Sequence, residues 1–290
     1  MDEIRLTSGD TSAVILPGKG GTVKQLCRAG TNFLYVDAEN LASDERPRCG
    51  IPFLFPICGR LQDRTYHWSG RPYTLDIHGF GHTARWEAVA QSAASVTLRL
   101  EDSDATRAVY PFRFRVELCY TLTPGRLAIR QSFTNTGTEE LPFAYGFHPY
   151  FAVADAQAAR VTVQADTQLD FTRGPVPFGA GSVALALPAG APEAGAAFAG
   201  AAAPAVLEDA AGGRRVTVAF DGSFSQLVLW AVRGKPFLCV EPWNGTANGL
   251  NTGVYETLAP GGAHTAEFAV SVEQLAPRPC GPNDQEGGTI

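Results

Sequence analysis

The residues best suited to chemistry in this sequence are a glutamate and three histidines. His78 and His82 bracket a Gly-Phe-Gly segment, where the glycines let other backbone approach an imidazole closely. His148 stands among four aromatic residues, and Glu241 directly follows the apolar run Phe237–Val240. A carboxylate at the end of a buried strand is partly desolvated, and this raises its pKa. Glu241 therefore has the environment that a general base requires.

Each of these residues also has a purely structural interpretation. A histidine among aromatics, such as His148, can be a hydrogen-bonded packing residue. Glu241 can cap a loop or form an ion pair with Arg60 or Arg233. Arg60 closes an almost wholly apolar run, where it either binds an anion or hydroxyls through its planar guanidinium or holds a loop in place.

The histidine pair also bears on metal binding. A spacing of four residues would suit a metal site on a helix, but glycines at positions 79 and 81 make a helix there improbable. The six cysteines form no C-x-x-C pair and no zinc-ribbon spacing, so we expect reduced, buried thiols. No phosphate-binding glycine motif is present, and we expect no cofactor and no metal.

Composition excludes several partners. The chain has 290 residues with 23 Lys plus Arg against 29 Asp plus Glu, a formal net charge of −6, which argues against binding the backbone of nucleic acid. Every apolar run is too short to span a membrane, and the acidic first residues do not resemble a secretory signal. We expect a cytoplasmic protein without nucleic-acid or membrane partners.

Short runs of alternating polarity indicate an all-β fold. Phe112–Leu122 and Leu127–Thr134 alternate with a period of two around a Thr-Pro-Gly-Arg turn, which predicts an antiparallel hairpin. No segment keeps a clean helical period, so a large β-sandwich or barrel in one domain over residues 1–290 is expected. Pro188–Ala205, rich in Ala, Gly and Pro, is predicted to be a loop, and Pro277–Ile290 a flexible tail. Further strands are predicted at Val96–Leu100, Val161–Ala165, Val216–Phe220, Leu227–Val232, Pro236–Val240 and Ala266–Val272.

Four segments in this order resemble the motifs of the aldose 1-epimerase (mutarotase) family. They are Gly50–Leu61, Ile77–Phe80, Gly146–Phe151 and Val240–Trp243, and the resemblance runs from about Leu6 to Val272. It is strongest to the bacterial aldose-epimerase-like branch with a His-Gly-Phe motif. The resemblance implies a large antiparallel β-sandwich, which agrees with the strand pattern.

The resemblance also implies an activity. A mutarotase interconverts the α and β anomers of an aldohexose by opening the sugar ring, so one group takes the proton of the C1 hydroxyl while another protonates the ring oxygen. Glu241 matches the family's base, His148 its acid, and His78 a second histidine that contacts the sugar near the ring oxygen. Each positioned proton transfer contributes about 10²–10⁴-fold in rate.

Further residues are expected to bind the substrate, a small sugar. Arg60 matches the family's hydroxyl-binding arginine and Asp221 a sugar-binding aspartate, while Trp243 and Phe147 are candidates for flanking the sugar because they adjoin the catalytic residues. In the hexose-6-phosphate branch an arginine stands where this chain has His82, with Arg85 three residues later, and this disfavours a phosphosugar without excluding one.

Three alternatives remain open. The chain could be a hexose-6-phosphate 1-epimerase, a non-catalytic carbohydrate-binding protein, or a metal-dependent cupin-type enzyme using His78, His82, His148 and Glu241. It is expected to act as a monomer or a homodimer.

Overall fold

The fold is built on long antiparallel hairpins, of which β10 (Phe114–Thr123) and β11 (Arg126–Asn135) are the clearest. In the computed structural model, which describes residues 2–170 and 174–275, the two strands pair from Phe114↔Asn135 to Thr123↔Arg126. Only Pro124 and Gly125 form the turn, and Gly125 takes the positive φ that the turn requires. The predicted hairpin is confirmed.

The remaining strands also pair antiparallel, and among the described residues only the isolated bridge Phe55↔Gly79 is parallel. Five of the other six predicted strand segments lie within strands of the structure, and the sixth, Pro236–Val240, begins one residue before its strand. The strands other than β10 and β11 are β1 (Ile4–Ser8), β2 (Thr11–Leu16), β3 (Thr22–Arg28), β4 (Thr31–Asn32), β5 (Phe53–Leu54), β6 (Thr65–Trp68), β7 (Arg71–Thr74), β8 (Glu87–Gln91), β9 (Ser95–Glu101), β12 (Leu141–Phe143), β13 (Gly146–Phe147), β14 (Tyr150–Ala152), β15 (Arg160–Asp170), β16 (Gly174–Val183), β17 (Glu193–Ala199), β18 (Ala202–Asp209), β19 (Arg214–Phe220), β20 (Gln226–Val232), β21 (Phe237–Trp243), β22 (Glu256–Leu258) and β23 (Ala263–Gln274).

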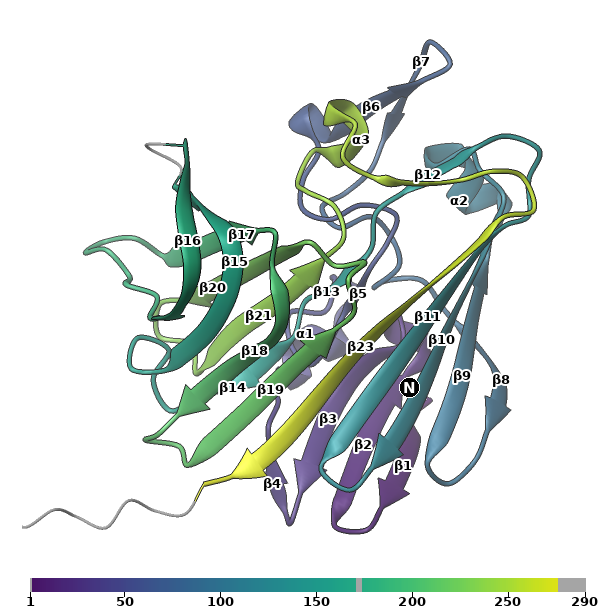
Figure 1. Cartoon of the computed structure of the whole chain (residues 1–290). Coiled ribbons are helices and arrows are strands. Elements are labelled where there is room, and N and C mark those ends of the chain that lie inside the picture. The colour runs from purple at the N-terminus through teal and green to yellow at the C-terminus, as the bar shows by residue number, and fades with distance from the viewer. Residues whose placement is uncertain (1, 171–173, 276–290) are drawn as a thin grey trace, which may run out of the picture.

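One large sheet dominates the molecule. Within the described residues it has 15 strands in the order β5-β13-β21-β20-β17-β15-β18-β19-β23-β11-β10-β9-β8, with β14 paired to β21 and β16 to β15. Figure 1 shows it as a broad fan, with β20 and β21 at one side and β8 and β9 at the other. A four-stranded sheet, β1-β2-β3-β4, lies behind the β8–β11 side.

The two sheets enclose a shared core. Side chains of β1–β3, such as Leu6 and Leu26, belong to the same buried cluster as Leu118 of β10 and Val270 of β23. The inner face of the four-stranded sheet thus packs against the inner face of the large sheet, which is the predicted antiparallel β-sandwich. The cluster extends to Val240 of β21, so the core reaches the strands that carry the candidate site.

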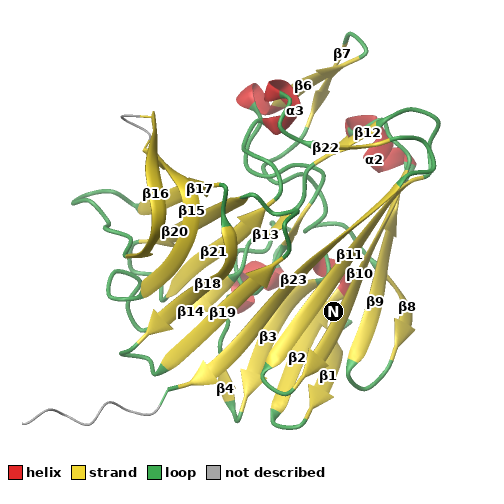
Figure 2. Cartoon of the chain, in the orientation of Figure 1, coloured by secondary structure: helices red, strands yellow, loops and turns green. Residues whose placement is uncertain are grey.

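Helices are few and short (Figure 2). They are α1 (Ala38–Ala42), α2 (Asp104–Val109), α3 (Gly249–Thr252) and the 3₁₀ turns η1 (Pro17–Lys19) and η2 (Gln62–Arg64). Among the described residues, no helix is long and apolar enough to cross a membrane.

One prediction about the strands is wrong. Pro188–Ala205 is not a loop: it contains β17 and the start of β18, and β17 lies between β15 and β20 inside the large sheet. The backbone of β17 pairs with β20 from Glu193↔Val232 to Ala199↔Gln226, so backbone hydrogen bonds hold a strand whose small side chains gave no strand signal. The predicted tail, Pro277–Ile290, lies outside the described residues.

Candidate functional site

Three of the sequence motifs become neighbouring strands at one end of the large sheet. β13 pairs with β5 on one side, through Gly146↔Leu54, and with β21 on the other, through Gly146↔Trp243. β14 continues along β21 with Tyr150↔Cys239. Segments that lie far apart in the sequence are thus hydrogen-bonded side by side.

This register sets the position of the catalytic candidates. β13 and β14 pair with β21 in the same register, through Gly146↔Trp243 and Tyr150↔Cys239. His148 and Glu241 are the midpoints between these two pairs and therefore lie opposite each other. His148 Nε2 lies 3.4 Å from Glu241 Oε1, and the two residues are only 8% and 1% exposed. The sequence had suggested that Glu241 lies at the end of its strand. In the structure it lies inside β21, because the strand continues through Pro242 to Trp243. The buried Glu–His pair is the centre of the site.

A tight turn brings His78 to the same place. The His78 ring lies 5.3 Å from the His148 ring and nearly perpendicular to it, at 88°. His78 and Gly79 both have positive φ, and a Cβ on Gly79 would lie 2.4 Å from the Phe55 carbonyl oxygen, so only glycine fits beside this histidine. The predicted absence of a helix here is confirmed.

The hydrogen bonding of His78 fixes its protonation. The backbone N–H of Gly59 donates to His78 Nδ1 over 3.0 Å, so Nδ1 is an acceptor and carries no proton. Burial, with the neighbouring histidines and arginines, holds the pKa of His78 well below its usual range. His78 is therefore a neutral imidazole that can donate only through Nε2–H.

Burial shifts the pKa values of the central pair in opposite directions. It raises the pKa of Glu241 well above its usual range, as expected from the sequence. Burial and the charge of Arg46 lower the pKa of His148 to about 3. The desolvation of a buried imidazolium is the largest cause of this shift. Burial thus favours the protonated form of Glu241 and the neutral form of His148.

Two residues beside the His148–Glu241 pair were not identified as candidates from the sequence. Arg46 is half-buried, and its charge opposes the upward shift of the pKa of Glu241. Cys239 stands two residues before Glu241 on the same face of β21 and is fully buried. The Arg-Pro-Arg sequence at positions 46–48, shortly before the Gly50 motif, was an available signal for Arg46, whereas nothing in the sequence of β21 alone marks Cys239.

Donor atoms of three side chains at the site come close enough together to hold a metal ion. They belong to His148, Cys239 and Glu241, and they lie within 4.8 Å of one another. Within the described ranges no other group of three such donors converges to this extent, so His78 and His82 do not complete the set that a cupin-type site would need.

The other histidine of the motif borders the site. His82 is buried, its ring is 6.2 Å from that of His78, and burial lowers its pKa to about 4. Arg85 is exposed and forms an ion pair with Asp2 at 2.9 Å, on the outside of the molecule.

Two of the four predicted substrate-binding residues lie at the site. The Trp243 indole is 5.7 Å from the His78 ring, and its Nε1 is buried with no hydrogen-bond partner among the described residues. Arg60 is exposed, and its charge contributes to the lowered pKa of His78. Neither Arg60 nor Arg233 forms an ion pair with Glu241 among the described residues, and Arg233 instead donates to the carbonyls of a neighbouring loop. The ion pair proposed as a structural role for Glu241 is therefore not formed.

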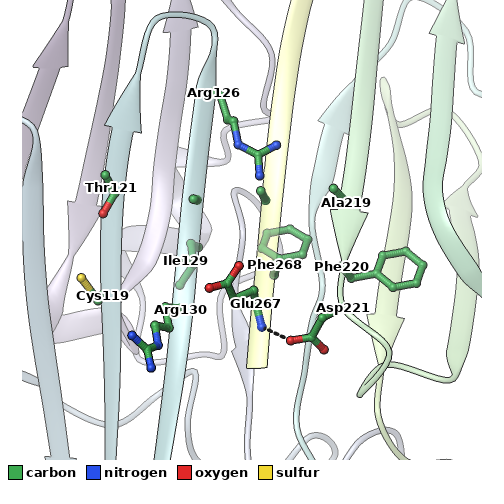
Figure 3. A pocket seen from close by; sticks show the side chains of 12 residues that line it. Cys119, Thr121, Arg126, Ile129, Arg130, Ala219, Phe220, Asp221, Glu267 and Phe268 are labelled. Atoms are coloured by element: carbon green, nitrogen blue, oxygen red, sulfur yellow. Dashed lines mark hydrogen bonds between the residues drawn. The ribbon is translucent and has the colours of Figure 1, made fainter. Parts of the chain in front are cut away.

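The other two substrate-binding predictions require correction. Phe147 is 1% exposed and its ring stacks on Phe268 at 4.2 Å, because alternation along β13 turns it toward the core while its neighbour His148 faces the site. Asp221 follows β19 and lines a separate pocket with Arg130 and Glu267 (Figure 3). Its carboxylate accepts from the backbone N–H groups of Ser223 and Glu267, at 2.9 and 2.6 Å. These contacts give Asp221 a structural role.

Of the described cysteines three are buried as expected, whereas Cys27 and Cys119 are only half-buried. Cys27, Cys49, Cys58, Cys119 and Cys239 are free thiols, and the last of these is the one at the site. Cys280 lies outside the described residues.

Together, the fold and site define a large antiparallel β-sandwich with a buried glutamate–histidine pair on one sheet. The family model "Aldose 1-epimerase" matches residues 2–271, and the chain belongs to this family. Among solved structures, protein Slr1438 of Synechocystis is 32% identical with a TM-score of 0.86, covering 94% of this chain and 96% of that one. Galactose 1-epimerase of Lactobacillus acidophilus is 18% identical with a TM-score of 0.73, covering 94% of this chain and 95% of that one, and shows the same fold.

Sequence relatives include proteins without an assigned activity. The uncharacterized protein YphB of Escherichia coli is 31% identical over 121 residues, and this match spans 39% of each chain. Chromosomal protein LacX of Lactococcus lactis is 24% identical over 238 residues, covering 70% of this chain and 76% of that one.

Proposed function

We propose that this protein is a cofactor-independent aldose 1-epimerase, an isomerase that interconverts the α and β anomers of an aldohexose. The observation that carries the proposal is the buried pair of His148 and Glu241, 3.4 Å apart, in which burial raises the pKa of the carboxyl and lowers that of the imidazole. Anomer exchange moves one proton off the C1 hydroxyl and one proton onto the ring oxygen, so the net proton count does not change. A pair with one proton has one acceptor and one donor at all times, as this exchange requires.

Glu241 is the proposed base and His148 the proposed acid. The sugar hydroxyls that reach the site hydrogen-bond to the carboxylate and stabilise its charged form, and the charge of Arg46 acts in the same direction. The proton then passes from Glu241 to His148 before the ring opens. Glu241 takes the C1 hydroxyl proton while His148 protonates the ring oxygen. After the C1 carbonyl has rotated, the two roles are reversed and the ring closes on the other face.

The surrounding residues hold the sugar. His78 presents Nε2–H as a neutral donor, suited to a sugar oxygen, because its Nδ1 is occupied by the Gly59 N–H. Trp243, beside it, offers an aromatic face for the C–H groups of a sugar and an indole N–H for a hydroxyl. Arg60 is exposed, and hydroxyl binding is its proposed role.

One observation favours a second substrate class. Arg46 is a half-buried cation close enough to affect the pKa values of His148 and Glu241, and a phosphate on the sugar would match its charge. A hexose-6-phosphate is therefore the alternative substrate.

The test is anomer-resolved NMR on freshly dissolved α-aldoses, with and without a 6-phosphate, each measured both with and without a chelator. The proposal predicts that the protein brings at least one of these sugars to anomeric equilibrium faster than buffer. Sugar binding by calorimetry without any acceleration would instead show a carbohydrate-binding protein, and acceleration that the chelator abolishes would show a metal enzyme.

A further inference from the structure

The buried catalytic pair is joined by a thiol that the epimerase reaction does not use. Cys239 is 0% exposed and alternates onto the same face of β21 as Glu241, while β14 pairs Tyr150 with Cys239. The His148 ring stacks on Tyr150 at 4.6 Å and 10°. The strand register thus gathers a sulfur, an imidazole nitrogen and a carboxylate oxygen at one point.

The distances between these atoms suit one ion. The three donors lie within 4.8 Å of one another, and His148 Nε2 is 3.4 Å from Glu241 Oε1. Zinc takes sulfur at about 2.3 Å and nitrogen or oxygen at about 2.0–2.2 Å in a tetrahedron, which sets its ligand atoms roughly 3.3–3.7 Å apart. The imidazole–carboxylate pair already has this separation, and the thiol requires a shift of about 1 Å by the same comparison.

Unused polar atoms support a ligand here. Glu241 Oε2 and His148 Nδ1 are both buried without a hydrogen-bond partner among the described residues. A buried polar atom without a partner is costly, and a bound cation would remove that cost for the carboxylate. The donor set is also balanced in charge, because a divalent cation with one thiolate and one carboxylate is neutral and tolerates burial.

We propose that His148, Cys239 and Glu241 form a binding site for a thiophilic divalent cation, and that occupation of this site inhibits the epimerase. On binding, the Cys239 thiol releases its proton to solvent, and so does Glu241 where it is protonated. The ion accepts the thiolate, a carboxylate oxygen and the imidazole nitrogen, and water completes its coordination. The thiolate selects Zn²⁺, Cd²⁺ or Co²⁺ over Mg²⁺ and Ca²⁺.

The inhibition follows from shared atoms, and this part rests on the proposed function. Coordination uses the carboxylate and the imidazole through which the sugar protons would pass. An ion held by both residues therefore prevents proton transfer. The binding itself does not depend on the catalytic assignment.

The first experiment titrates the reduced, metal-free full chain with Cd²⁺ and follows the thiolate-to-metal charge-transfer absorption. The wild type is expected to bind one equivalent with this absorption, and Mg²⁺ in excess should not displace it. Cys239→Ser should lose the absorption and bind at least about tenfold more weakly, which corresponds to about 1.4 kcal/mol. Cys119→Ser, which removes a half-buried thiol of β10 outside the cluster, is the matched control and should bind like the wild type.

A second variant guards against misfolding of Cys239→Ser. Glu241→Gln keeps the side-chain shape but removes the anionic ligand, and it should retain the absorption with at least about tenfold weaker binding. Wild-type affinity and absorption in Cys239→Ser would overturn the proposed site.

The second experiment measures epimerase activity during the same titration. The proposal predicts that activity falls with the midpoint of Cd²⁺ binding and that Cys239→Ser, active without metal, resists the ion. Binding that leaves activity unchanged or raises it would overturn the inhibitory role. If the wild type has no activity without metal, the proposed function fails, whereas the binding site is still tested by absorption.

Discussion

Holding His148 neutral should make the folded protein sensitive to acid. Its pKa is lowered to about 3 in the folded state from the ordinary value of 6.5. Between these values the unfolded chain binds a proton that the folded chain does not. His148 therefore costs no stability above pH 6.5, and its burial destabilises the folded protein increasingly as the pH falls toward 3. The loss is about 1.4 kcal/mol per pH unit, or roughly 2.7 kcal/mol between pH 6.5 and about pH 4.5.

The test is the free energy of unfolding in urea, measured at several pH values for the wild type and His148→Gln. The wild-type value should fall more steeply with acid than that of the variant, by about 2.7 kcal/mol at about pH 4.5 relative to pH 6.5. Glu241 contributes to the pH dependence of both proteins, so comparing them reduces its effect. His67→Gln, the same change at an exposed position of β6, should follow the wild type. Equal slopes for the wild type and His148→Gln would refute the view that burial keeps this imidazole neutral.

Three further substitutions test the architecture of the site. Gly146→Ala would place a Cβ 2.7 Å from Trp243 Cδ1, so we expect a loss of about 1–3 kcal/mol in urea unfolding and slower turnover, and wild-type values for both would contradict this packing. Phe147→Leu should lower stability by about 1–3 kcal/mol and leave the KM for the sugar unchanged, whereas a raised KM with unchanged stability would restore Phe147 as a sugar contact. Asp221→Asn should keep full activity and lose about 1 kcal/mol of stability, and loss of activity in a folded variant would return Asp221 to the sugar site.

The sequence predicted those parts of the fold in which side chains alternate. The hairpin of β10 and β11 was evident because its two faces meet different environments, a buried one and a wet one. β17 was missed because it consists almost wholly of alanine and glycine around Phe198. Such a strand is held by backbone pairing with its neighbours, a tertiary effect that leaves no local pattern.

The site residues that belong to sequence motifs could be predicted, whereas those placed by the register between strands could not. Glu241, His148 and His78 were found from their surroundings and from family resemblance, and the structure brings them together. Cys239 joins them only because β14 and β21 pair in one register, which cannot be read from either segment alone. Phe147 was misplaced for a related reason, since sequence adjacency to a catalytic residue in a strand means the opposite face.

The central claim is that Glu241 is the base of an aldose 1-epimerase. The most direct measurement is the rate of α-to-β conversion of the preferred sugar by the wild type and Glu241→Gln, with urea unfolding of both as the check on folding. Because glutamine is neutral and has a similar shape, it avoids the cost of burying a carboxylate, and the variant should fold with at least wild-type stability. The account predicts at least about a 100-fold loss of rate in this folded variant. Epimerisation by folded Glu241→Gln at the wild-type rate would contradict it.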